Sequence, residues 1–282
     1  MEKVEIPGIK NIVVVASGKG GVGKSTIAAG LAVKLAKEGY KIGIMDGDIY
    51  GPSIPTLFDL QDEKAGCYKN DEGKMRITPF EKYGIKIMSV GFVVESNKAT
   101  LWRGLLASNA FKQILTDTEW GNLDYLIIDT PPGTGDIHLS LLQSFKINGV
   151  VIVTTPQVLS SIDVKKSMMM FRNPHLGVPM YGVVENMSWF TPSKHPNEKY
   201  FLYGQGGGEV LANQFNIPLL ARIPTTEQLC YSCDGGKLEY LFDNQWVNEG
   251  FDALIDGIIN PKPTYVRYIN GEKIEAKSAV LR

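Results

Sequence analysis

The sequence predicts an α/β fold in which helices flank a doubly wound, mainly parallel sheet. Short apolar runs rich in β-branched residues alternate with stretches of helical periodicity, which is the pattern of βαβ units. The runs are apolar on both faces, as expected for strands that are covered on both sides. The clearest runs are residues 12–16, 41–45, 125–129, 149–153 and 180–184, and residues 219–223 form a weaker one.

The chain length favours one large domain with small additions. A chain of 282 residues is at the upper end of what one hydrophobic core serves, so we expect a single domain over residues 1–260. Polar, turn-forming residues at about 61–84 indicate an inserted hairpin, with a short strand at 75–78. An Asn-Gly pair between two alternating segments predicts a hairpin-like tail over residues 261–282.

Charge and composition exclude several classes of protein. The 29 basic and 30 acidic residues leave a formal charge of -1, so neither nucleic acid nor a membrane is expected as a partner. No apolar run has the length of a signal peptide or of an uncharged membrane span, which predicts a cytoplasmic protein. The 3 cysteines are too few and too unevenly spaced for a disulfide framework.

The first helix is predicted between the first two strands. Ile27, Leu31 and Leu35 recur every four residues and therefore share one helical face. Gly39 follows them, and glycine is the residue best suited to the left-handed position that ends a helix. Residues 12–45 thus read as a strand, a loop, a helix and a second strand.

A glycine-rich segment joins the first strand to this helix. Its residues are Gly18, Lys19, Gly20, Gly21, Val22, Gly23, Lys24, Ser25 and Thr26. In this context the pattern predicts a P-loop that binds ATP. Its backbone N–H groups can turn inward towards the phosphates, Lys24 can reach the β and γ phosphates, and Ser25 can ligate Mg²⁺. Lys19 is either a solvated charge of the loop or a charge that contacts nucleotide across a dimer interface.

Carboxylates follow two more of the predicted strands. Asp129 ends the strand at 125–129, where it can hold a water bound to Mg²⁺ as a Walker B residue does. Asp46 and Asp48 follow the second strand and are expected to face the same crevice. We expect Asp48 to orient the attacking water and to contact Mg²⁺ through water. The alternative is that Asp46 and Asp48 are exposed carboxylates of a turn.

Several motifs together carry a family resemblance. They are Ser17 to Thr26, Asp48-Ile49-Tyr50-Gly51-Pro52-Ser53-Ile54-Pro55, Ile128-Asp129-Thr130-Pro131-Pro132-Gly133-Thr134-Gly135-Asp136, Thr155-Pro156-Gln157 and Glu185-Asn186-Met187-Ser188. On these motifs the chain resembles the Mrp-type iron-sulfur cluster carrier ATPases, within the deviant Walker A P-loop NTPases that include MinD and ParA. The resemblance covers about residues 7–260.

The resemblance implies a function and roles for single residues. It implies a homodimer that binds and slowly hydrolyses ATP and carries clusters between assembly factors and client apoproteins. It also implies that Lys19 acts across the dimer, that Asp48 lies near the hydrolytic water, that Asp129 is the Walker B carboxylate and that Asn186 contacts adenine. From its residue type alone, Asn186 is equally well explained as a hydrogen-bonded loop asparagine.

One departure from the family concerns the cluster ligands. Carriers of this kind usually have a Cys-x-x-Cys soon after the Asn-Met-Ser segment, but residues 189–197 contain no cysteine. Cys230 and Cys233 form another such pair, and two protomers could supply four thiolates to a bridging 4Fe-4S cluster or to zinc. The alternative is that these are small buried residues without a ligand role. Cys67 has no assigned function.

Two other functions remain open from the sequence. A MinD-like or ParA-like positioning ATPase would share the P-loop, although the tail reads as a hairpin and not as the basic amphipathic helix that binds membranes. A nucleotide-dependent scaffold that does not bind a cluster would explain the loop without cysteines. Methionines at 168–170 are interpreted as core packing, and His138 and His175 have no spacing that suggests chemistry.

Overall fold

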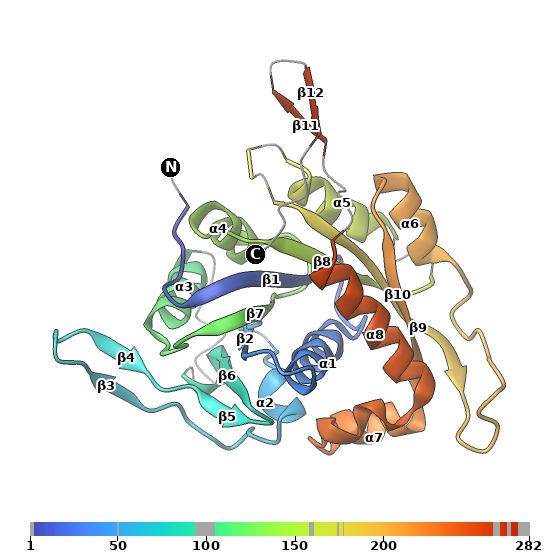
Figure 1. Cartoon of the computed structure of the whole chain (residues 1–282), viewed down its shortest axis with the longest axis horizontal. Helices are drawn as coiled ribbons and strands as arrows, with labels where there is room; N and C mark the ends of the chain where they lie inside the picture. Colours follow the sequence, from blue (N-terminus) through green and yellow to red (C-terminus); the bar gives the residue numbers. More distant parts are fainter. Residues whose placement is uncertain are drawn as a thin grey trace.

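A single eight-stranded sheet forms the centre of the molecule (Figure 1). The computed structural model describes residues 3–49, 51–93, 105–157, 161–173, 175–176, 178–261, 266–269 and 272–275. The strand order is β10-β9-β8-β1-β7-β2-β6-β5. The strands are β1 (Ile9–Ser17), β2 (Ile42–Asp46), β5 (Phe80–Lys82), β6 (Ile85–Ser89), β7 (Leu123–Asp129), β8 (Gly149–Thr154), β9 (Met180–Thr191) and β10 (Leu219–Thr226).

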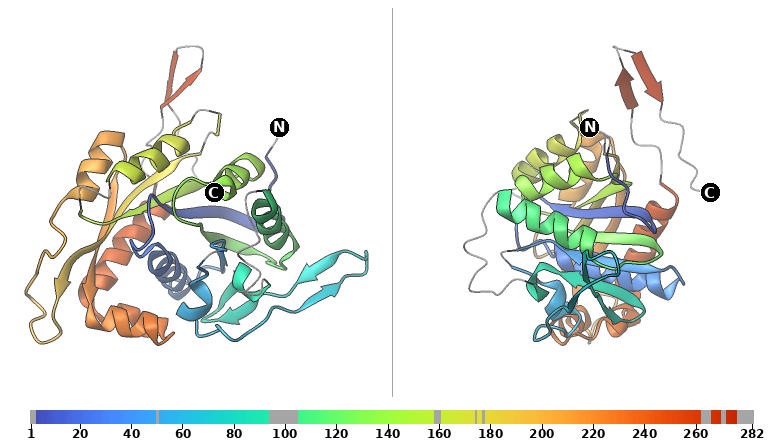
Figure 2. Two further views of the ribbon diagram at one scale, coloured as in Figure 1. Left: turned by 180° about the vertical axis from the view of Figure 1, so that it is seen from behind. Right: turned by 90° about the vertical axis from the view of Figure 1, so that its left-hand side faces the viewer.

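Helices cover both faces of this sheet, which confirms the predicted fold class (Figure 2). Helices α1 and α8 pack against each other on one face, and α3 with α4 and α5 with α6 form contacting pairs on the other. The helices are α1 (Lys24–Lys37), α2 (Ile54–Leu57), α3 (Leu105–Asp117), α4 (Asp136–Ser144), α5 (Ser161–Phe171), α6 (Gly207–Phe215), α7 (Glu227–Asp234) and α8 (Gln245–Ile259). None of the helices in the described part of the chain is long and apolar enough to cross a membrane.

All the apolar runs identified in the sequence are strands of this sheet. Every pairing in this sheet is parallel except that of β5 with β6, and the central strands are buried on both faces. The predicted first helix is α1, whose Ile27, Leu31 and Leu35 are fully buried. Gly39 follows it with φ +89°, the left-handed conformation that favours glycine.

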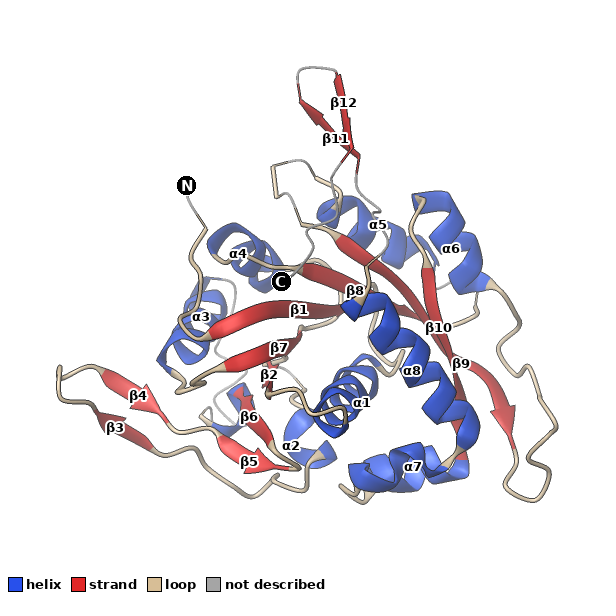
Figure 3. Cartoon of the chain, viewed as in Figure 1, coloured by secondary structure: helices blue, strands red, loops and turns tan. Residues whose placement is uncertain are grey.

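The region 61–89 contains the expected hairpin and, after it, two strands that were not expected. Strands β3 (Cys67–Lys69) and β4 (Met75–Ile77) form a separate antiparallel pair, coloured red at the left of Figure 3. The residues after them join the main sheet, because β6 pairs in parallel with β2 and β5 pairs antiparallel with β6. Strand β6 was not predicted, because Lys86 interrupts its apolar residues.

The C-terminal hairpin is described only in part. Strands β11 (Val266–Ile269) and β12 (Glu272–Glu275) pair antiparallel, as the sequence predicts. The Asn-Gly turn at 270–271 lies outside the described residues. The division into a domain that ends at residue 260 and a tail at 261–282 stays a prediction.

The parallel arrangement brings the functional segments to one edge of the sheet. Strands β1, β2 and β7 are adjacent and end at Ser17, Asp46 and Asp129. Asp46 lies opposite Asp129 in the pairing of β2 with β7. Ligands bind at the carboxyl ends of strands in open α/β sheets, so this edge is where a nucleotide site is expected.

Candidate nucleotide-binding site

A cavity of about 410 Å³ lies at the carboxyl edge of β1. Most of its wall comes from the predicted P-loop, and the rest comes from the loop after β2, the loop after β7 and the end of α7. Its lining residues are Ser17, Lys19, Gly20, Gly21, Val22, Gly23, Lys24, Ser25, Thr26, Asp48, Pro52, Ser53, Thr56, Leu57, Pro132, Cys233 and Asp234. The structure therefore brings the predicted phosphate-binding residues and Asp48 to one cavity.

The glycine-rich loop has the backbone geometry of an anion-binding loop. Gly21 and Gly23 both have φ +77°, which an L side chain rarely adopts. Gly23 is also the N-cap of α1, and no side chain caps that helix start. The first N–H groups of the helix therefore point towards the cavity without a side-chain acceptor, which favours phosphate oxygens there.

Lys24 and Asp129 form a buried ion pair beneath this loop. The Lys24 Nζ is 2.5 Å from Oδ1 of Asp129, and the side chains are 7% and 0% exposed. Burial raises the pKa of Asp129, and the Lys24 ammonium opposes that shift. The second oxygen of Asp129, Oδ2, is buried and has no hydrogen-bond partner among the described residues. Ser25 lies beside the same carboxylate, so an unpaired oxygen and a hydroxyl are together where Mg²⁺ would be held.

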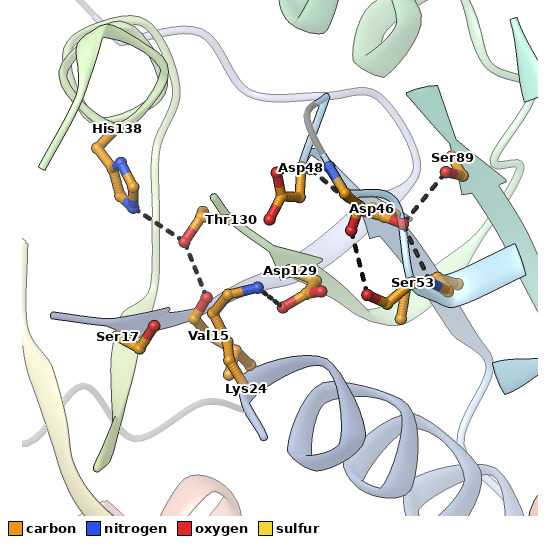
Figure 4. A network of polar contacts seen from close by, with 12 residues as sticks. Val15, Ser17, Lys24, Asp46, Asp48, Ser53, Ser89, Asp129, Thr130 and His138 are labelled. Atoms are coloured by element: carbon orange, nitrogen blue, oxygen red, sulfur yellow. Dashed lines mark hydrogen bonds and ion pairs between the residues drawn. The ribbon is translucent and has the colours of Figure 1, made fainter. Parts of the chain in front are cut away.

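Asp46 is not the exposed turn carboxylate that the sequence left open as an alternative. It is fully buried and accepts hydrogen bonds from the N–H of Asp48 at 3.0 Å, the N–H of Ile54 at 3.1 Å and the Ser89 hydroxyl at 3.2 Å (Figure 4). Burial raises the pKa of Asp46 to about 7, with a further contribution from the nearby charge of Asp129. Asp48 is half-buried at the cavity wall, so the structure separates an anchoring carboxylate from one that faces the cavity.

Comparison with known proteins decides the family. A sequence model of the ParA family, described as NUBPL iron-transfer P-loop NTPase, matches residues 8–259. The chain belongs to this family. This confirms the resemblance to the deviant Walker A ATPases that the motifs indicated.

Curated relatives and solved structures agree with this placement. Iron-sulfur cluster carrier proteins of Aquifex aeolicus and Pseudomonas fragi are each 45% identical to this chain over 83% of its length. The alignments span 62% of the Aquifex relative, 60% of a Synechocystis relative and 81% of the Pseudomonas relative. A nucleotide-binding protein from Archaeoglobus fulgidus, solved in complex with ADP, is 39% identical, with a TM-score of 0.70 over 83% of this chain and 89% of that chain.

MinD from Pyrococcus horikoshii, solved with Mg-ADP, shares the fold at 20% identity. Its TM-score is 0.61 over 88% of this chain and 95% of that chain. At this identity the likeness shows the architecture alone. It supports the P-loop NTPase fold and says nothing about positioning as a function.

Two contacts of this ParA-family site were not evident from the sequence. The Nδ2 of Asn186, in the middle of β9, donates a hydrogen bond to the Val22 carbonyl at 2.9 Å, and a Cβ on Gly23 would lie 2.2 Å from the same nitrogen. His138 Nε2 lies 3.0 Å from the Thr130 hydroxyl, which donates to the Val15 carbonyl at 3.0 Å. Asn186 therefore supports the P-loop, whatever it contacts in a bound nucleotide.

His138 belongs to the buried polar layer behind Asp129 (Figure 4). Burial lowers its pKa to about 4, so its imidazole is neutral at physiological pH. Because the Thr130 hydroxyl donates to Val15, it accepts from His138, which places the imidazole hydrogen on Nε2. His138 thus helps to hold the side chain of Thr130, the residue after Asp129.

The thiols of the chain lie in three different environments. Cys67 is exposed on β3, and Cys230 is exposed on α7. Cys233 is buried on the same helix and borders the nucleotide cavity. Burial raises the pKa of Cys230 and raises that of Cys233 to about 11, with a smaller opposing contribution from the Thr26 hydroxyl. Both thiols of α7 are therefore protonated in the unliganded chain.

The loop after β9, where carriers usually have cysteines, is held by aromatic contacts. The Lys199 Nζ lies 4.2 Å from the ring centroid of Trp189 and 4.0 Å from that of Trp246, within the range of a cation–π contact. The Trp246 indole N–H donates to the Pro196 carbonyl at 2.9 Å. The Nδ1 of His195 lies 3.3 Å from Oε1 of Glu198. This loop is thus built from packing contacts.

Proposed function

We propose that this chain is an ATP-binding and ATP-hydrolysing homodimeric carrier or scaffold in iron-sulfur cluster assembly, in which hydrolysis is coupled to transfer of a cluster to a client apoprotein. The observation that carries the proposal is the buried Lys24–Asp129 pair under a P-loop, in a chain of a family described by iron transfer. An iron-sulfur cluster as the cargo is supported by relatives that are named iron-sulfur cluster carrier proteins.

The chain's own residues account for the hydrolytic step. Lys24 turns from Asp129 to the β and γ phosphates when nucleotide enters, because phosphate oxygens then offer it a stronger acceptor set. Ser25, and Asp129 through a water, would hold Mg²⁺, which would neutralise part of the phosphate charge. Asp48, fixed through its N–H by Asp46, orients the attacking water from the opposite wall of the cavity.

Lys19 is the residue through which a second protomer would act. It lines the cavity and its side chain is half-buried, while its carbonyl accepts a hydrogen bond from the Ser17 hydroxyl at 3.0 Å. That contact fixes the backbone of Lys19 and leaves the ammonium to reach a partner's nucleotide. A charge supplied across an interface stabilises the transferred phosphoryl group as an arginine finger does.

A scaffold that hydrolyses ATP without binding a cluster is the second candidate. It is favoured by the loop at residues 192–197, which has no cysteine and is held by Trp246 and Lys199. The two candidates share the nucleotide chemistry and differ only in cargo. Iron and sulfide content therefore separates them.

The test combines hydrolysis with cargo content. We expect Lys24→Ala to lower MgATP hydrolysis about 100-fold, because an electrostatic group in a dry site is worth that much. The matched control is Lys74→Ala, since the Lys74 side chain is 68% exposed and pairs only locally with Glu72. Anaerobic reconstitution of the wild type should yield iron and sulfide. Equal hydrolysis in all three proteins would contradict the ATPase, and a metal-free wild type would favour the scaffold.

A further inference from the structure

The cysteines that could bind an iron-sulfur cluster together lie on one helix, α7. Thiolates are the usual protein ligands of iron-sulfur clusters, and the whole sequence contains 3 cysteines. Cys67 lies on the β3–β4 hairpin, which projects from the left of the molecule in Figure 1, whereas α7 lies at the lower right. Cys230 and Cys233 are therefore the thiols that can act together.

Helix α7 presents this pair next to the nucleotide cavity. Thr226 caps the helix by accepting a hydrogen bond from the Leu229 N–H at 3.0 Å, so the first turn is fixed. Residues three apart lie side by side on a helix. Cys230 is exposed to solvent, and Cys233 borders the cavity together with Asp234. A metal held by both sulfurs would sit at the mouth of the cavity.

We infer that Cys230 and Cys233 are the cargo ligands of this chain and that a second copy completes the site with its own pair. The inference rests on the proposed function. Within the part of the chain that the structure describes, no group of three or more histidine, cysteine, aspartate or glutamate side chains could hold a metal ion. One chain therefore offers half of the ligands of a 4Fe-4S cluster, and two chains offer the four that it needs.

Loading is a ligand exchange and not a redox step. A preformed 4Fe-4S cluster on small-molecule thiolates gives up four sulfur ligands and gains four from the two chains. Each protein thiol loses its proton as its iron–sulfur bond forms, and each departing thiolate takes one up. No oxidant or reductant is required, because the charge of the cluster core does not change.

The position of α7 links this cargo site to the nucleotide. The Thr26 hydroxyl, in the first helical turn after the P-loop, is a hydrogen-bond neighbour of Cys233, and α7 packs against α2, which follows the Asp48 loop. A nucleotide that rearranges either element therefore changes the surroundings of Cys233. By linkage, a bound cluster changes the affinity for nucleotide by the same factor.

The experiment is anaerobic cluster loading of the full chain, with iron, sulfide and oligomeric state measured together. Wild type and Cys67→Ser should each hold about two irons and two sulfides per chain, as one cluster shared by two chains requires. Cys230→Ser is the principal variant, because its side chain is exposed and its loss does not disturb the core. It should lose most of the iron, and Cys233→Ser should behave alike.

The possible outcomes separate the site from the function. Full loading of both α7 variants would place the ligands elsewhere and overturn this inference while leaving the carrier function intact. A wild type that holds no cluster would overturn both. The loaded wild type and Cys67→Ser should also bind ADP with at least about fivefold changed affinity relative to the unloaded chains. An unchanged ADP affinity would overturn the link between the two sites.

Discussion

The two sides of the nucleotide cavity are built in different ways. On the P-loop side, Lys24 is already paired with Asp129, and Asp46 already holds the Asp48 loop. On the α7 side, Cys230 and Cys233 have raised pKa values, and as the proposed cargo ligands they would supply only half of a ligand set. The nucleotide-site residues of one chain are thus already paired with one another, whereas the proposed cargo site and the proposed action of Lys19 both require a second chain.

The largest expected effect comes from breaking the ion pair on the P-loop side. Asp129→Asn leaves the buried Lys24 ammonium without a counter-charge, which should lower the free energy of unfolding by about 3 to 5 kcal/mol. Urea denaturation measures this change. Glu72→Gln is the control, because Glu72 pairs with Lys74 in an exposed pair, and its stability should equal that of the wild type. A stable Asp129→Asn protein would show that the pair is not preorganised.

A second prediction sharpens the role of P-loop geometry. Gly23→Ala should weaken ADP binding at least about tenfold, because its Cβ would meet the Asn186 amide at 2.2 Å in a left-handed conformation. Gly73→Ala has nearly the same φ, +73°, with nothing within 4 Å of the added carbon, and should leave ADP binding unchanged. Titration calorimetry of both variants measures the two ADP affinities. Equal ADP affinities would contradict the close packing of Asn186 on the loop.

Only some of the site residues could be predicted from the sequence. The P-loop could be predicted because strand, glycines, Lys24 and Ser25 are contiguous. The contact of Asn186 with Val22 joins residues 164 positions apart, so no local pattern could reveal it. His138 was dismissed for want of ligand spacing, although its partner Thr130 is only eight positions away, because its role depends on burial.

The same reasoning applies to the fold. Continuous apolar runs identified the central strands, whereas β6 was missed because Lys86 divides it and because it follows a polar insertion. Its strand character comes from pairing with β2, which is a tertiary contact. The Lys199 contact with Trp189 and Trp246 was missed for a similar reason.

A third prediction concerns the buried layer behind Asp129. The pKa of His138 in the folded chain, about 4, is below the ordinary value of 6.5, so the unfolded chain takes up a proton first as the pH falls. Stability from this group is complete above pH 6.5 and is lost as the pH falls towards 4. At pH 5 the loss should be about 2 kcal/mol.

Unfolding free energies at pH 7.5 and pH 5 measure this loss. His138→Gln should lack that part of the pH dependence, and His195→Gln, which changes an exposed histidine, should keep it. If the pH dependence of stability were identical in the wild type and His138→Gln, His138 would not be the buried neutral imidazole that we describe.

The smallest expected effect is on the α7 side. Thr226→Ala removes the side-chain cap of α7 and should cost about 1 kcal/mol of unfolding free energy. Because this cap does not border the P-loop, ADP affinity of the cluster-free chain should stay the same, while cluster loading should decrease. Calorimetry and iron analysis of one preparation test both. If ADP affinity decreased by the same factor as the iron content, the P-loop side and the α7 side would not be independent.

In the proposed function, ATP hydrolysis drives the release of cargo. The most direct measurement is the anaerobic transfer of a cluster from the loaded protein to an apo-ferredoxin, followed by circular dichroism with MgATP, with MgADP and without nucleotide. We expect the fastest transfer with MgATP in the wild type. With MgATP, Asp48→Asn should transfer the cluster no faster than it does without nucleotide. Transfer rates that are the same in the wild type under all three conditions would contradict it.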